Sequence, residues 1–346
     1  MRPLHLLLPA ALLAGAGVFA ATTALTDPTP PAQPGAAVEV RLGYFPNVTH
    51  ATAIVGVERG LFAKELGDST KLKTFTFNAG PAAIEALLSG ALDATYIGPN
   101  PAVNAFVKSH GEAVRVVCGA TSGGAALVVD PSIATAADLK GKKLATPQLG
   151  NTQDVALRAW LKAQGFELSL TGASEVTVLP QDNAQTLDAF RQHQIAGAWV
   201  PEPWGAYLVS EAGAKIIAEE KDLWPDNEFV LTLVITTPKF LREHPDIVQK
   251  ILAVHRSYTA KLNASAGSLE PELADALFQL TQKKLPPGVV SDALTRIKFT
   301  DEPLPASMQA MSQWTTELGF SRDKTALDGL VDTALLRKFQ GARDEP

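Results

Sequence analysis

Short runs of β-forming residues alternate with segments of helical periodicity along most of the chain. The runs 38–45, 72–80 and 92–98 (VEVRLGYF, LKTFTFNAG and LDATYIG) are rich in apolar, β-branched and aromatic residues, which predicts strands. Between them, the segment 81–90 (PAAIEALLSG) has apolar residues at helical spacing, begins with proline and ends with glycine. Strands that alternate with helices of this length predict α/β units with largely parallel sheets.

The alternation continues through a second group of elements. We predict strands in VRVVCGA, AALVVD, DLKGKKLATP, SEVTVLP and IAGAWVPEPW, and helices in LGNTQDVALRAWLKAQG and DNAQTLDAFRQHQ. FVLTLVITT (229–237) is a further strand, and the pattern after Pro238 is mostly helical. This order predicts two lobes, 38–122 and 123–225, with residues 226–346 returning to the first lobe. The chain would cross between them near TSGGAALVV and LWPDNEFVL, as in hinged proteins that close around a ligand.

The N-terminal segment predicts export. Arg2 gives a short positive region, residues 4–18 are mostly apolar, and Val18 and Ala20 fit the −3 and −1 positions of a signal-peptidase site. We therefore predict a signal peptide over 1–20 and a spacer rich in Pro, Ala and Thr over 21–37. The apolar run contains Pro9 and is shorter than the roughly 20 residues of a spanning helix, so an uncleaved anchor is the less favoured alternative.

The composition is that of a globular protein, with 46% hydrophobic and 19% charged residues among 346. The net charge of −6 and the lack of a long basic run argue against nucleic-acid binding. Cys118 is the only cysteine, which excludes an internal disulfide and a cysteine-based metal cluster; we expect it to be a buried strand residue. The charged stretch EEKD (219–222) predicts a solvated face.

The segments that follow the predicted strands contain the candidate binding residues, because open parallel sheets bind ligands beyond the carboxyl ends of their strands. These segments are YFPNVTHA, FNAGPAA, IGPNPAV, PQLGNTQD, LPQDNAQ and VPEPWGA, and none contains Lys or Arg. Several lead into helix N-termini, whose N–H groups and dipole attract anions. Thr49 is a candidate N-cap of the helix after the first strand, and Asn151 or Thr152 is a candidate N-cap of the helix in LGNTQDVALRAWLKAQG. Among these segments only His50 could add positive charge. Helix capping is enough to explain any one of these segments. Several such segments at the same edge of the sheets favour a binding cleft.

The common enzyme motifs are absent from the sequence. It contains no G-x-S-x-G, no G-x-x-x-x-G-K-[ST] and no H-E-x-x-H, and AGPAAIEAL lacks the G-x-G-x-x-G of dinucleotide binding. We therefore predict no catalytic residues, no cofactor and no metal site.

Five segments together resemble the nitrate/sulfonate/taurine branch of the solute-binding proteins of ABC importers: GYFPNVTHA, VGVERGLFAKELG, NAGPAAIEALLSGALDATYIGPNPAVNAF, ADLKGKKLATPQLGNTQDVALRAWL and AWVPEPW. The resemblance covers Val38 to Ile235. It implies a type II periplasmic-binding-protein fold, with two α/β lobes, two hinge crossovers, a ligand clamped between the lobes and a helical C-terminal part. It also implies a receptor without enzymatic activity that delivers its solute to a permease and its ATPase; we expect a monomer.

The resemblance implies ligand-binding positions in five turns. In the first lobe they are Asn47, Thr49 and His50, then Asn78, Ala79 and Gly80, then Gly98, Pro99 and Asn100; in the second they are Gln148, Asn151, Thr152 and Gln153, then Glu202 and Trp204. Many relatives carry a lipid-modified cysteine after L-A-G, whereas here Ala16 follows LAG, so we expect a freely soluble periplasmic or secreted protein.

Glu202 is an unusual member of this set, because Pro201 and Pro203 stiffen the backbone around it. We expect Trp204 to form an apolar wall of the site, with core packing as an equal alternative, and Trp199 to lie in the core. Glu202 would accept a hydrogen bond from the ligand, such as from the ammonium of taurine. It would otherwise link the lobes or cap a helix.

The neutral caps suit a small, always-ionised organic anion or zwitterion, and we favour an aliphatic sulfonate or a taurine-like compound. Nitrate or bicarbonate is the nearest alternative within the same family. An enzyme on the same fold, such as a pyrimidine-precursor synthase, and a sensory receptor are more distant ones; the signal peptide argues against a cytoplasmic enzyme.

Overall fold

The computed structural model describes residues 37–170, 174–321 and 326–341. The predicted signal peptide (1–20) lies outside the described residues, as does the predicted spacer (21–37) except for Ala37. Among the described helices, none combines the length and the apolar character that crossing a membrane would require.

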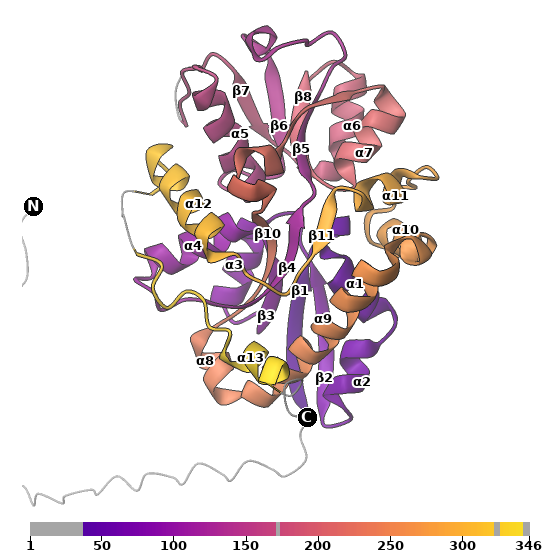
Figure 1. Cartoon of the computed structure of the whole chain (residues 1–346), viewed down its shortest axis with the longest axis vertical. Coiled ribbons are helices and arrows are strands. Elements are labelled where there is room, and N and C mark those ends of the chain that lie inside the picture. The colour runs from indigo at the N-terminus through magenta and orange to yellow at the C-terminus, as the bar shows by residue number, and fades with distance from the viewer. Residues whose placement is uncertain (1–36, 171–173, 322–325, 342–346) are drawn as a thin grey trace, which may run out of the picture. The chain divides into compact units, whose positions relative to one another are not determined.

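Eleven strands in the described part of the chain form two separate sheets (Figure 1). The six-stranded sheet has the order β11-β4-β10-β3-β1-β2, with β1 (Val38–Tyr44), β2 (Thr70–Thr76), β3 (Ala94–Ile97), β4 (Arg115–Gly123), β10 (Val230–Thr236) and β11 (Ile297–Phe299). The five-stranded sheet has the order β7-β6-β8-β5-β9, with β5 (Ala125–Val129), β6 (Lys143–Thr146), β7 (Thr177–Pro180), β8 (Gly197–Pro201) and β9 (Lys215–Glu219). We call the six-stranded sheet with its helices the first lobe, and the five-stranded sheet with its helices the second lobe.

Helices cover both faces of each sheet. Around the first sheet lie α1 (Ala51–Glu58), α2 (Leu61–Leu66), α3 (Gly80–Leu88), α4 (Pro99–Lys108), α8 (Pro238–Glu243), α9 (Pro245–Ser265), α10 (Glu270–Thr281), α11 (Val289–Leu294), α12 (Pro305–Glu317) and α13 (Ala334–Gly341). Around the second lie α5 (Thr152–Ala163), α6 (Asn183–Arg191) and α7 (Trp204–Ala212). Figure 1 shows α5 on one side of the second sheet and α6 and α7 on the other.

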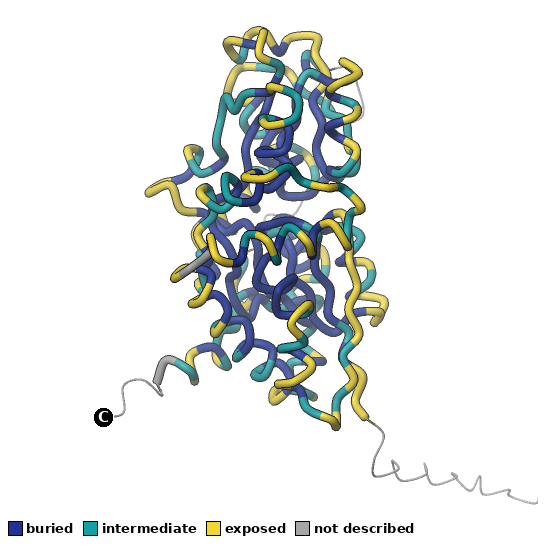
Figure 2. The backbone as a smooth tube through the Cα atoms, turned by 90° about the vertical axis from the view of Figure 1, so that its right-hand side faces the viewer, coloured by how far each residue is buried: buried dark blue, intermediate teal, exposed yellow. Residues whose placement is uncertain are grey.

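Burial on both faces explains why the strand sequences are apolar without a break. Every residue of β10 is buried; Leu233 and Ile235 belong to the core cluster of α3 and α4, whereas Val234 belongs to the cluster of α1 and α9. Such a strand needs apolar residues at every position and not only at alternate ones. Figure 2 shows buried segments in the interior of both lobes and exposed residues mostly at the periphery.

The chain crosses between the lobes twice, as predicted. β4 ends at Gly123 in the first sheet and β5 begins at Ala125 in the second. Gly123 and Gly124 have φ of 74° and 83°, a left-handed conformation that glycine adopts without a steric penalty. The return path runs from β9 to β10 through short 3₁₀ turns at Glu220–Leu223 and Pro225–Asn227.

The structure differs from the sequence expectations around β9. This strand and β11 were not among the predicted elements, and the stretch 219–222 is not a uniformly solvated face. Glu220 is fully buried, where its Oε2 accepts a hydrogen bond from Trp199 Nε1 at 2.8 Å. Burial raises the pKa of Glu220 to about 8, so the carboxyl is mostly protonated at neutral pH.

Candidate functional site

A small cavity lies between the two lobes, at the ends of the strands. The first lobe lines it with Phe45, Asn47, Thr49, His50, Asn78, Ala79, Gly80, Gly98, Pro101 and Leu231, and the second with Pro147, Asn151, Thr152, Gln153, Asn183 and Pro201. The cavity has a volume of about 20 Å³, room for about one water molecule, so any larger ligand requires the lobes to lie further apart than they do here.

The N-termini of four α-helices meet at this cavity. Gly80 and Thr152 are the first residues of α3 and α5, Asn183 is the first residue of α6, and Gly98 is the N-cap of α4. The first N–H groups of a helix have no partner within the helix, and the dipole adds partial positive charge at the same end. The cavity therefore favours negative charge although no charged side chain is among its lining residues in the described structure.

His50 does not contribute positive charge, contrary to the possibility raised by the sequence. Its side chain is 3% exposed and its ring stacks on Phe45 with centroids 4.6 Å apart. Burial lowers the pKa of His50 to about 3, so the imidazole is neutral at physiological pH. Its Nδ1 accepts a hydrogen bond from the Phe45 N–H at 3.3 Å, which leaves the ring proton on Nε2. Thr49 does not cap α1 either; His50 occupies the N-cap position without a side-chain hydrogen bond.

Asn151 holds the start of α5 in place, as predicted from the sequence. Its Oδ1 accepts from the Asp154 N–H at 2.9 Å, and its Nδ2 donates to Gln153 Oε1 at 3.1 Å. The buried Asp154 carboxylate is balanced by Arg158 Nε at 3.2 Å and accepts from the Gly150 N–H at 2.9 Å. This acidic group is thus neutralised behind the cavity and does not line it.

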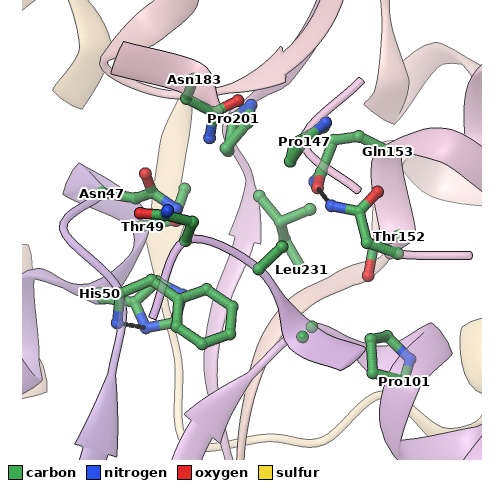
Figure 3. Close-up of a pocket in the computed structure, with 16 residues that line it drawn as sticks. Asn47, Thr49, His50, Pro101, Pro147, Thr152, Gln153, Asn183, Pro201 and Leu231 are labelled. Carbon is green, nitrogen blue, oxygen red and sulfur yellow. Dashed lines mark hydrogen bonds between the residues drawn. The ribbon is translucent and has the colours of Figure 1, made fainter. Parts of the chain in front are cut away.

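Two polar atoms of the lining are buried without a partner among the described residues. They are Thr152 Oγ1 and Asn183 Oδ1, on side chains of residues that are 2% and 7% exposed. Buried polar atoms in native proteins nearly always have a hydrogen-bond partner. Figure 3 shows Asn183 across the cavity from His50 and Pro101, with Thr152 and Gln153 on one side of it and Asn47 and Thr49 on the other.

The lobes touch closely at Gly98 and Thr152. A Cβ atom added to Gly98 would lie closer than 3.0 Å to Thr152 Oγ1 and 3.4 Å from Thr152 Cβ. Gly98 has φ −70° and ψ 154°, which any residue can adopt, so its backbone does not require glycine. The absence of a side chain at this position is what allows the lobes to approach.

Glu202 lies outside the cavity lining and connects the lobes. Its Oε2 accepts from the Ala206 N–H at 3.0 Å, in the first turn of α7, and its Oε1 pairs with Arg296 Nη1 at 3.1 Å. Burial raises the pKa of Glu202 to about 7 despite these favourable partners. Both carboxylate oxygens therefore have protein partners. The structure matches the alternative in which Glu202 links the lobes and caps a helix, and not the one in which it binds the ligand.

Two further hydrogen bonds attach the Glu202 turn to the first lobe. The Val48 N–H donates to the Glu202 carbonyl at 2.9 Å, and Trp204 Nε1 donates to Asn47 Oδ1 at 2.8 Å. Trp204 is 3% exposed and packs in the core instead of forming a wall of the cavity, whereas Trp199 lies in the core as expected.

The structure brings most of the sequence-derived site residues together. The cavity is lined by Asn47, Thr49, His50, Asn78, Ala79, Gly80, Gly98, Asn151, Thr152 and Gln153, and not by Pro99, Asn100, Gln148, Glu202 or Trp204. Asn100 points elsewhere because its Nδ2 donates to Thr315 Oγ1 at 3.1 Å. The residues that sequence reasoning missed are Phe45, Pro101, Pro147, Asn183, Pro201 and Leu231. Asn183 lies in the segment LPQDNAQ, so the position of that segment after a strand was the available signal.

Comparisons with known proteins support the fold and the family. The model of the NMT1-like family matches residues 33–270. A protein of Brucella abortus (strain 2308) named "putative binding protein" is 31% identical over 221 residues, 63% of this chain and 65% of that protein. The chain thus matches less than two thirds of the length of this relative.

Two further comparisons extend this result. The taurine-binding periplasmic protein of Escherichia coli (strain K12) is 25% identical over 213 residues, 62% of this chain and 63% of that protein. The alkanesulfonate-binding protein from Xanthomonas axonopodis pv. citri, in a structure with MOPS bound, has a TM-score of 0.70 at 22% identity; the match covers 87% of this chain and 99% of that one. The structural likeness confirms the predicted periplasmic-binding-protein fold.

Proposed function

The chain belongs to the NMT1-like family, and we propose that it is the extracytoplasmic solute-binding protein of an ABC importer, without enzymatic activity. The observation that carries this proposal is the convergence of four helix N-termini on a neutral cavity between two hinged lobes. Helix N-termini stabilise an anion without a cationic side chain. The ligand would be captured by closure of the lobes and passed to a membrane permease with its ATPase.

The proposed ligand is a small organic oxyanion, most simply an aliphatic sulfonate. A sulfonate is ionised at all physiological pH values, so a site of neutral donors needs no cation or general base to hold it. The names of the taurine-binding and alkanesulfonate-binding relatives support this class. The small volume of the cavity favours nitrate or bicarbonate as the second candidate.

The domain division and location are part of the same proposal. We propose lobe boundaries close to the expected 122/123 and 225/226, with the first moved to Gly124 because Gly123 still belongs to β4, and we expect a monomer. Export through a cleaved signal peptide, without a lipid anchor, would leave the protein free in the periplasm or medium.

A thermal-shift screen tests the proposal, because a ligand that binds only the folded state stabilises it. At 100 times its Kd, a ligand adds about 2.7 kcal/mol to the free energy of unfolding. The panel contains ethanesulfonate, longer alkanesulfonates, taurine, nitrate and bicarbonate, and hits are confirmed by calorimetry. We expect at least one sulfonate to raise the melting temperature; no response to any of these anions would reject the proposal.

A further inference from the structure

The two unpartnered atoms in the cavity differ in what they can bind. Thr152 Oγ1 can donate, and it lies at the first residue of α5, next to the N–H groups of the first helical turn. This side of the cavity is therefore suited to the oxygen atoms of an anion. Asn183 Oδ1, at the first residue of α6, is an acceptor and therefore requires a hydrogen-bond donor.

The donor that meets Asn183 has to be uncharged, because the cavity offers nothing to neutralise an ammonium. Its lining residues include neither Asp nor Glu. Two buried carboxylates nearby already have partners within the protein. Glu202 pairs with Arg296 and accepts from the Ala206 N–H, and Asp154 pairs with Arg158 and accepts from the Gly150 N–H. The only counter-charge of a taurine ammonium would be its own sulfonate, which it also has in water, so its burial against a neutral acceptor costs more than the burial of a hydroxyl that makes one hydrogen bond.

Building on the proposed function, we propose that Asn183 recognises a neutral donor at the far end of the ligand, so that the protein prefers short hydroxyalkanesulfonates to aminoalkanesulfonates of equal length. Thr152 and the start of α5 would hold the sulfonate, and Asn183 the hydroxyl. This assigns Asn183 as a specificity-determining residue and transfers to it the role that the sequence suggested for Glu202.

Three ligands of equal carbon length test the assignment: 2-hydroxyethanesulfonate, ethanesulfonate and taurine. Calorimetric titration of the wild type should show the hydroxyl compound binding roughly tenfold more tightly than ethanesulfonate, the value of one hydrogen bond to a buried acceptor. Taurine should bind more weakly than the hydroxyl compound, by at least tenfold.

Two variants separate recognition from folding. Asn183→Ala should bind ethanesulfonate and 2-hydroxyethanesulfonate about equally; both have one negative charge, so long-range electrostatics cancel in the ratio. It should also melt like the wild type, because Asn183 Oδ1 has no partner to lose within the described structure. Asn183→Asp should raise the affinity for taurine relative to 2-hydroxyethanesulfonate. Asn104→Ala is the matched control, since Asn104 lies on α4 but does not line the cavity, and should keep the wild-type preference.

The outcomes distinguish the inference from the proposed function. Equal binding of the hydroxyl and plain compounds by the wild type, tighter binding of taurine, or an unchanged preference in Asn183→Ala would each overturn the inference alone. If neither these sulfonates nor nitrate bind, the proposed function fails and the inference fails with it.

Discussion

Replacing Gly98 by Ala should impair closure of the lobes while leaving the fold intact. The added Cβ would approach Thr152 Oγ1 to less than 3.0 Å, and the two residues belong to different lobes. The clash therefore exists only while the lobes are closed and disappears when they separate. The variant should populate the open form, so that a ligand has to overcome the clash in order to bind.

The size of the effect follows from the contact. Overpacking a well-packed contact costs about 1–3 kcal/mol, which corresponds to roughly 5- to 150-fold weaker binding. Thr152 is 2% exposed, so its hydroxyl has little room to rotate away. The stability of the fold should change little, because two small effects oppose each other. Alanine restricts the unfolded chain, which stabilises by about 0.4–1 kcal/mol, but it is a poorer N-cap than glycine by a similar amount.

Calorimetry and small-angle scattering measure binding and closure separately. Wild type with saturating ligand should have a smaller radius of gyration than without it, and Gly98→Ala should need more ligand to reach the same state. Gly43→Ala is a matched control, because its Cβ would lie 2.6 Å from the hydroxyl of Thr95 within the first sheet. That variant should lower the melting temperature but leave the affinity of the folded protein unchanged.

A second substitution shows whether the predicted clash is the cause. Thr152→Ala in the Gly98→Ala background removes the obstructing oxygen, so ligand-induced compaction should return even if affinity stays low. If Gly98→Ala binds with wild-type affinity, the added Cβ causes no clash and the reasoning is refuted. If the variant shows no melting transition, the substitution disrupts the fold itself and not the contact between the lobes, which also refutes the reasoning.

Three further predictions concern the start of α5 and the Glu202 link. Thr152→Ala should weaken anion binding by about 1.5–3 kcal/mol without destabilising the fold, since Thr152 Oγ1 has no partner in the described structure; unchanged calorimetric affinity would remove it from the site. Asn151→Ala should in addition lower the free energy of unfolding by about 0.5–2 kcal/mol, because the Asp154 N–H loses its acceptor; a urea titration measures this loss, and equal stability would contradict it. Glu202→Gln should flatten the pH dependence of stability. Burial raises the pKa of Glu202 from 4.5 to about 7, so the free energy of unfolding of the wild type should fall by about 3 kcal/mol relative to that of the variant as pH rises from 4.5 to 7. Urea titrations measure both proteins across this range, and the same pH dependence in both would contradict the prediction.

The layout of the fold was predictable because it depends on local patterns. β10 is apolar at every position, which already indicates a strand covered on both faces, and the Gly123–Gly124 pair marks the first crossover. β9 was harder to predict, because its residues KIIAE are each half-buried and two of the five are charged. Glu220 shows the same limit: the sequence shows a charged run, but only the packing of Trp199 against it reveals a buried carboxyl.

The same limit applies to the site: roles that depend on neighbouring residues in the sequence were predictable, and roles that depend on a distant segment were not. Asn151 caps α5 through contacts three residues away, so its sequence context was sufficient. The role of Glu202 depends on Arg296, which lies 94 residues further along the chain, and no local pattern links the two. Because Glu202 is paired with Arg296 and does not line the cavity, no carboxylate reaches a ligand there from the described lining, and in our proposal Asn183 selects between a hydroxyl and an ammonium.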